Sequence, residues 1–101
     1  MEYIYKYYNK KDWQSFYQNV VAKHWQNRKD IYDHLTKLNI FDDDVCKSIA
    51  ALSRYNSSFE DVESVDNWLD RKIPALENIS PKQIVAIKNG MDSIRVYILR
   101  S

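Results

Sequence analysis

The residues that most often carry chemistry are few in this chain, and their spacing fits no catalytic pattern. Cys46 is the single cysteine, and a Cys46–His nucleophile pair stays open, although a lone cysteine on a helix is usually a small core residue. His24 and His34 stand outside the H-x-x-x-H and H-E-x-x-H patterns that bind zinc. The one glycine, Gly90, cannot build a glycine-rich phosphate loop. The sequence therefore disfavours an enzyme and predicts no cofactor.

Two groups of acidic residues could suggest a cation site, but each has a simpler explanation. The three aspartates at residues 42–44 lack the glycine and the downstream glutamate of a calcium loop. They fit better at the positive end of a helix, where negative charge is stabilising. Glu60, Asp61, Glu63 and Asp66 lie on one helical face, which we interpret as solvated surface. We predict no metal site.

Composition limits the classes of protein that this chain can belong to. Its 101 residues are 45% hydrophobic and 29% charged, which is typical of one globular domain. The net charge of +1 disfavours a nucleic-acid binder that uses its whole surface. No apolar run approaches the length of a membrane span, and residues 1–10 are too polar for a secretion signal. We therefore expect a cytoplasmic protein that makes no membrane contact.

The spacing of apolar side chains predicts an all-α fold, a compact bundle of about five or six short helices. Apolar residues recur at i, i+3, i+4 and i+7 along most of the chain. The segments expected to be helical are residues 11–26, 28–38, 42–55, 59–69, 80–89 and 91–98. The core candidates are Trp13, Trp25, Phe41, Trp68 and Leu69. His24 falls in the first apolar stripe, so a packed, hydrogen-bonded histidine is expected there rather than a metal ligand.

Several helix boundaries are marked by residues with known capping preferences. Asp12 is a candidate N-cap, and Asn39 is a candidate C-terminal stop. Ser57 and Glu60 form a capping-box pattern, and Ser80 followed by proline predicts another helix start. Gly90, the sole glycine, lies where a left-handed residue would close a helix.

The N-terminal segment is unusually aromatic. Residues 1–10 carry tyrosines at alternate positions, which we interpret as an extended arm or a frayed helix start. A small core cannot easily cover Tyr3, Tyr5, Tyr7, Tyr8 and Trp13 together, and exposed apolar patches usually mark contacts. We therefore expect self-association, for which a two-fold homodimer is the commonest form.

An ordered series of motifs runs through residues 59–101. Its members are Trp68, Leu69, Pro74, Ala75, Leu76, Pro81, Ile84, Val85, Gly90, Ile94, Ile98 and Leu99. The series resembles the toxin-binding domain at the C-terminus of Xre/MbcA/ParS-type bacterial antitoxins. Four positions depart from that pattern: Val65 replaces a small alanine, Lys72 replaces a proline, and residues 77–78 replace a glycine pair. Asn78 can still serve the turn, because asparagine tolerates left-handed geometry.

The resemblance implies an antitoxin of a type II toxin–antitoxin system, which binds and neutralises a RES-domain toxin that consumes NAD. In such pairs the C-terminal end of the antitoxin lies at the mouth of the toxin's active site. The corresponding residues here are Arg95, Tyr97, Leu99, Arg100 and Ser101. Arginine and tyrosine are frequent interface anchors. The alternative is that Tyr97 and Leu99 close the domain's own core.

The resemblance divides the chain into residues 1–56, a helical region, and residues 57–101, the toxin-binding domain, and we expect the two to form one compact unit. Many relatives carry a helix-turn-helix for promoter DNA in the first region, and residues 28–55 could hold a degenerate one. The aspartates at residues 42–44 would repel phosphates if their helix read the DNA. Two alternatives stay open: a DNA-binding transcriptional regulator, and a stand-alone adaptor or phage-derived inhibitor.

Overall fold

Helices build the architecture, as the apolar spacing predicts. In the computed structural model, which describes residues 3–101, 73% of the chain is helical. No strand forms in this range, and the only sheet-like contact in it is one isolated bridge between Ile73 and Ile79. The radius of gyration is 12.5 Å, close to the roughly 13 Å of a compact 100-residue domain. The all-α class is confirmed.

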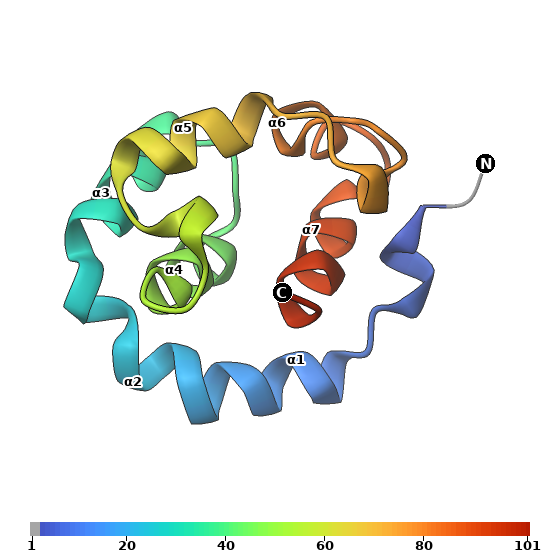
Figure 1. Cartoon of the computed structure of the whole chain (residues 1–101). Helices are drawn as coiled ribbons and strands as arrows, with labels where there is room; N and C mark the ends of the chain where they lie inside the picture. The colour runs from blue at the N-terminus through green and yellow to red at the C-terminus, as the bar shows by residue number, and fades with distance from the viewer. Residues whose placement is uncertain (1–2) are drawn as a thin grey trace.

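Two helices lie in the middle of the molecule and the others surround them (Figure 1). The central pair is α4 (Asp43–Leu52) and α7 (Gly90–Leu99). The surrounding helices are α1 (Lys10–Phe16), α2 (Ala22–His24), α3 (Lys29–Leu38), α5 (Val62–Asp70) and α6 (Pro81–Ile84). A short 3-10 segment at Ile4–Tyr7 precedes α1, and others join later helices at Trp25–Arg28, Ser57–Phe59 and Pro74–Leu76. Both central helices therefore bury more than one face, and α4 carries Val45, Cys46, Ile49 and Ala50 inward.

The helix predicted for residues 11–26 differs from the prediction in its first residue and in its register. Its N-cap is Asn9, whose side chain accepts from Asp12 N at 3.1 Å, so the prediction of Asp12 as the cap is wrong. A π-helical turn (Tyr17–Val21) follows α1 and shifts every later side chain around the axis. His24 is consequently exposed rather than packed, and that prediction is also wrong. Trp25 is only half-buried.

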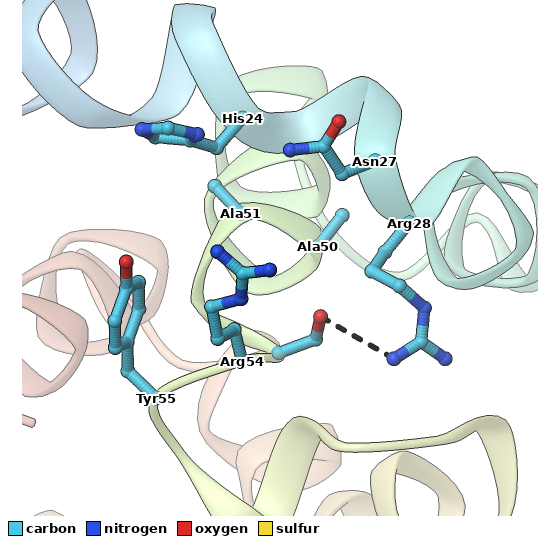
Figure 2. Close-up of a pocket in the computed structure, with 8 residues that line it drawn as sticks. His24, Asn27, Arg28, Ala50, Ala51, Arg54 and Tyr55 are labelled. Carbon is cyan, nitrogen blue, oxygen red and sulfur yellow. Dashed lines mark hydrogen bonds between the residues drawn. The ribbon is translucent and has the colours of Figure 1, made fainter.

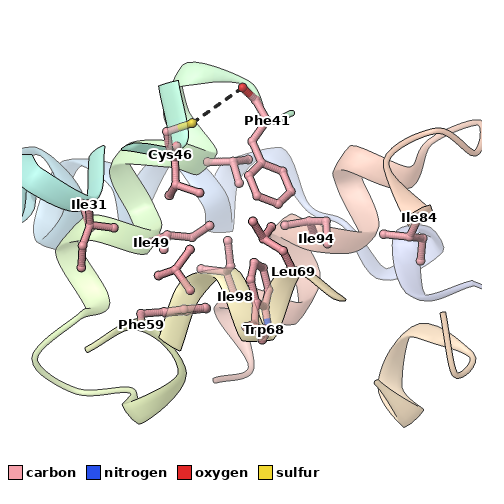
Figure 3. Close-up of a cluster of buried hydrophobic side chains, with 14 of the residues drawn as sticks. Ile31, Phe41, Cys46, Ile49, Phe59, Trp68, Leu69, Ile84, Ile94 and Ile98 are labelled. Carbon is pink, nitrogen blue, oxygen red and sulfur yellow. Dashed lines mark hydrogen bonds between the residues drawn. The ribbon is translucent and has the colours of Figure 1, made fainter. Parts of the chain in front are cut away.

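One apolar core joins the two predicted regions of the chain (Figure 3). Trp13 and Phe41 come from residues 1–56, whereas Trp68 and Ile98 come from residues 57–101, and all four lie in the same buried cluster. The ring of Phe59 meets Trp68 edge-on, with centroids 4.9 Å apart. Such aromatic pairs add about 0.5–1.5 kcal/mol beyond the area that they bury.

Helix boundaries in the second half follow some of the predicted caps. Ser80 accepts from Gln83 N at 3.2 Å with proline at the first helical position, as predicted. The capping box at residues 57–60 is wrong, because α5 begins at Val62 with Asp61 as its N-cap. Asp61 Oδ1 accepts from Ser64 N at 2.7 Å, which satisfies an N–H group that the helix itself leaves unpaired.

Left-handed backbone occurs where asparagine and glutamate stand, and not at glycine. Asn39 and Asn78 have φ of 55° and 59°, as predicted, and Glu77 has φ of 60°. Gly90 was predicted to take this geometry, but Asn89 does so with φ of 62°, and Gly90 is instead the first residue of α7. A Cβ on Gly90 would lie 1.7 Å from the carbonyl oxygen of Ile84. Glycine is needed there because the backbones of α6 and α7 touch.

The N-terminal segment is docked on the domain rather than extended. The 3-10 turn Ile4–Tyr7 packs along α7 (Figure 1), and Tyr5 N donates to the buried Ser93 Oγ at 3.1 Å. Trp13 is buried and Tyr8 packs against the core, as does Tyr3. Of the aromatics behind the expectation of self-association, Tyr5 and Tyr7 stay exposed. A homodimer stays a prediction.

Candidate protein-binding face

Arg95, the first of the predicted toxin-binding residues, is held inside the domain by aspartates. Its Nε and one terminal nitrogen each lie 3.0 Å from an oxygen of Asp44, which makes a two-pronged ion pair. The guanidinium also reaches Asp42 at 2.7 Å and Asp92 at 2.8 Å. Trp13 Nε1 donates to the same Asp44 carboxylate at 2.8 Å. This network ties α7 to the start of α4 and to α1.

The network stabilises the charged forms of its members. Partial burial disfavours the charge on Arg95, but the hydrogen bonds to Asp44 and Asp42 outweigh it and raise the Arg95 pKa above its ordinary value. Burial likewise opposes ionisation of Asp44, yet Arg95 and Trp13 hold the pKa of that carboxyl below its usual range. The Arg95 side chain is only 13% exposed. Its N–H groups already donate to aspartates within the domain, so they are not available to a partner.

Tyr97 and Leu99 lie between core and surface. The Tyr97 ring packs on Trp68 with centroids 6.0 Å apart, and the residue also lines a surface cavity. Leu99 is half-buried and packs against the core. Both side chains therefore help to close the core, as the alternative predicts, but both also stay partly exposed.

Arg100 and Ser101 form the exposed end of this region. The guanidinium of Arg100 lies over the ring of Tyr7, 5.0 Å from its centroid. Ser101 Oγ donates to the carbonyl of Tyr97 at 2.8 Å. A cavity of about 240 Å³ opens beside them, lined by Ile4, Asn56, Ala75, Tyr97, Arg100 and Ser101. We call these six residues together with Tyr7 the C-terminal face.

The motif residues that carry the resemblance occupy two kinds of position. Trp68, Leu69, Leu76, Pro81 and Gly90 are buried, whereas Pro74 and Ala75 are exposed. Ala75 is part of the C-terminal face, so one member of the series reaches the surface where the last predicted residues gather.

The other candidates for chemistry lie apart from this face. Burial raises the pKa of the Cys46 thiol to about 11, and its Sγ lies 3.7 Å from the carbonyl oxygen of Phe41. His34 pairs with Asp66 at 2.6 Å and His24 is exposed, and within the described residues no hydrogen bond joins Cys46 to either histidine, so the Cys46–His pair left open by the sequence does not form. Within residues 3–101 no three acidic, histidine or cysteine side chains gather as a metal site. No helix of that range has both the length and the apolar character needed to span a bilayer.

Sequence reasoning missed the partners of the two arginines. Asp44 lies 51 positions before Arg95, and Tyr7 lies 93 positions before Arg100, so neither contact leaves a local pattern. The run of aspartates at residues 42–44 was the one available signal, and it was interpreted as a helix start alone. No protein-family model matches this chain, and no curated protein or solved structure matches it significantly.

Proposed function

We propose that this chain is an antitoxin that binds a cognate toxin through the C-terminal face. The observation that carries the proposal is Arg100: it is exposed, and its guanidinium rests on the exposed ring of Tyr7 beside a cavity. Tyrosine and arginine are the residues most often found as interface anchors. Motif residues of the antitoxin resemblance lie directly behind and beside this face.

The contrast between Arg95 and Arg100 indicates which arginine is available to a partner. Arg95 is hydrogen-bonded to three carboxylates. Among the described residues, Arg100 contacts the Tyr7 ring and donates no side-chain hydrogen bond. Its N–H groups are thus free to bind a carboxylate or phosphate in two-pronged fashion. In this proposal Arg95 holds α7 in place, and Arg100 makes the contact.

The resemblance supplies the class of partner, a RES-type toxin that consumes NAD. A guanidinium entering the active site of such an enzyme would meet groups that otherwise receive the phosphate oxygens of NAD. Occlusion of that mouth would neutralise the toxin without any chemistry by this chain.

The test is co-expression with the product of the neighbouring gene, followed by affinity measurement on the purified pair. Arg100→Glu should weaken binding by about 2 kcal/mol or more, roughly thirtyfold, because it removes an interface anchor. Lys37→Glu makes the same charge change on exposed α3 and should bind as the wild type does. Point variants are preferable to removing residues 99–101, since Leu99 also packs on the core.

Two results would count against the proposal. An Arg100→Glu protein that still binds the toxin and protects cells from it would exclude the C-terminal face as the contact. A salt-dependent shift of promoter DNA by the chain alone, without a co-purifying partner, would favour the transcriptional regulator instead.

A further inference from the structure

A second cavity, of about 460 Å³, shares no lining residue with the C-terminal face, although its Tyr55 directly precedes Asn56 of that face. It opens between the helical segment after α2 and the end of α4 (Figure 2). Its lining consists of His24, Asn27, Arg28, Ala50, Ala51, Ser53, Arg54 and Tyr55. The two alanines are buried and form an apolar floor, while polar side chains surround it. The volume falls within the range of small-molecule sites, roughly 300–1,000 Å³.

Of the five arginines, Arg54 is the one for which residues 3–101 supply no partner. Within residues 3–101 the other four each have one: Arg28 has Asp30, Arg71 has Ser58, Arg95 has its aspartates and Arg100 has Tyr7. Arg54 makes no side-chain hydrogen bond, ion pair or ring contact in that range. Figure 2 shows its guanidinium directed toward the segment that carries His24 and Asn27.

The polar groups near Arg54 are unused as well. The side chains of His24, Asn27 and Tyr55 make no hydrogen bond with any described residue, and Tyr55 is 69% exposed. Arg28, in contrast, is bound to Asp30 at 3.1 Å and to the carbonyl of Glu60 at 2.7 Å. The uncompensated positive charge of the cavity therefore lies at Arg54, away from Asp30.

We propose that this cavity binds a mononucleotide, with the phosphate on Arg54 and the base on Tyr55. A guanidinium matches the geometry of phosphate oxygens, and a histidine N–H can donate to the same group. An exposed tyrosine ring offers a stacking surface for a planar base. The Asn27 amide lies on the segment that the Arg54 guanidinium faces, so its N–H groups can donate to the phosphate as well. An acidic peptide could pair a carboxylate with Arg54, but it would bring no planar base to stack on the Tyr55 ring.

The experiment is calorimetric titration of the full chain with AMP, adenosine and inorganic phosphate at one salt concentration. AMP should bind more tightly than either fragment, because it uses both ends of the cavity. Arg54→Ala should weaken AMP binding about tenfold or more, the usual effect of losing a hydrogen bond to a charged group. Arg71→Ala removes the same charge from an exposed site outside the cavity and should leave AMP binding unchanged. Tyr55→Ala should weaken AMP and adenosine but not phosphate.

Several outcomes would overturn the proposal. They include no heat of binding at millimolar AMP, equal loss in the Arg54→Ala and Arg71→Ala proteins, and phosphate binding as tightly as AMP. Binding of duplex DNA that depends on Arg54, without AMP binding, would assign the cavity to a nucleic-acid backbone instead. All three substituted side chains are exposed, so the melting curves of the variants should match that of the wild type and keep these outcomes interpretable.

Discussion

Replacing Arg95 by methionine tests the network that joins the two halves of the chain. The substitution keeps an apolar stem of similar length and removes the contacts to Asp42, Asp44 and Asp92. Asp44 would then keep only the 2.8 Å hydrogen bond from Trp13 Nε1 among its side-chain partners. The carboxylate would retain its charge in a half-buried position, which costs free energy when the opposite charge is gone.

The expected loss in the free energy of unfolding lies between that for a surface ion pair and that for a buried ion pair. Exposed ion pairs contribute about 0–1 kcal/mol, and breaking a fully buried pair costs about 3–5 kcal/mol. The side chains here are 13% exposed for Arg95, 31% for Asp44 and 58% for Asp42. Water can therefore reach part of Asp44, and we expect a loss of about 2–3 kcal/mol in the free energy of unfolding. That corresponds to a melting temperature lower by roughly 10–20 °C for a domain of this size.

The assay is urea unfolding followed by circular dichroism, in a double-mutant cycle with Asp44→Asn. The coupling energy between the two sites should be about 1 kcal/mol or more, since they form a two-pronged pair. Arg71→Met is the control, because Arg71 is exposed and its loss should change stability by less than about 0.5 kcal/mol. The reasoning would be refuted if Arg95→Met lowered the free energy of unfolding by less than about 0.5 kcal/mol. It would also be refuted if the effects of Arg95→Met and Asp44→Asn were simply additive in the double mutant.

Two further predictions follow from the packing and charges. Gly90→Ala should lower the free energy of unfolding by about 3 kcal/mol or more, because a Cβ 1.7 Å from Ile84 O forces α6 and α7 apart. Thermal melting checks this, and an unchanged melting temperature would contradict it. The folded-state pKa of Asp44 lies below its ordinary 3.8, so its stabilisation is present above about pH 4 and lost as pH falls through the lower, folded value. Urea unfolding between pH 7 and pH 2 should show this decline, and Asp44→Asn should make it shallower. An identical slope in both proteins would exclude the Asp44–Arg95 pair as its source.

Local sequence determined the helical class and much of the core. Apolar spacing near 3.6 residues places Trp68 and Leu69 inward whatever the tertiary arrangement, because a helix must bury its apolar stripe. The stop at Asn39 and the start at Ser80 are likewise local, since each cap bonds to backbone a few residues away. The same spacing misplaced His24, because the π-helical turn before it changed the register of the stripe.

Only the tertiary structure decided the roles of the residues that act across the chain. The local sequence around Gly90 predicts a helix end, but in the fold Gly90 lies where the backbones of α6 and α7 are in contact. Arg95 and Arg100 are five positions apart, but Arg95 contacts aspartates at the start of α4 and in α7, whereas Arg100 lies on the ring of Tyr7. Arg54 carries no sequence signal, and only the placement of the end of α4 opposite the segment after α2 shows that it has no partner among the described residues. A sequence records which side chains a helix presents, whereas the packing of helices fixes what those side chains meet.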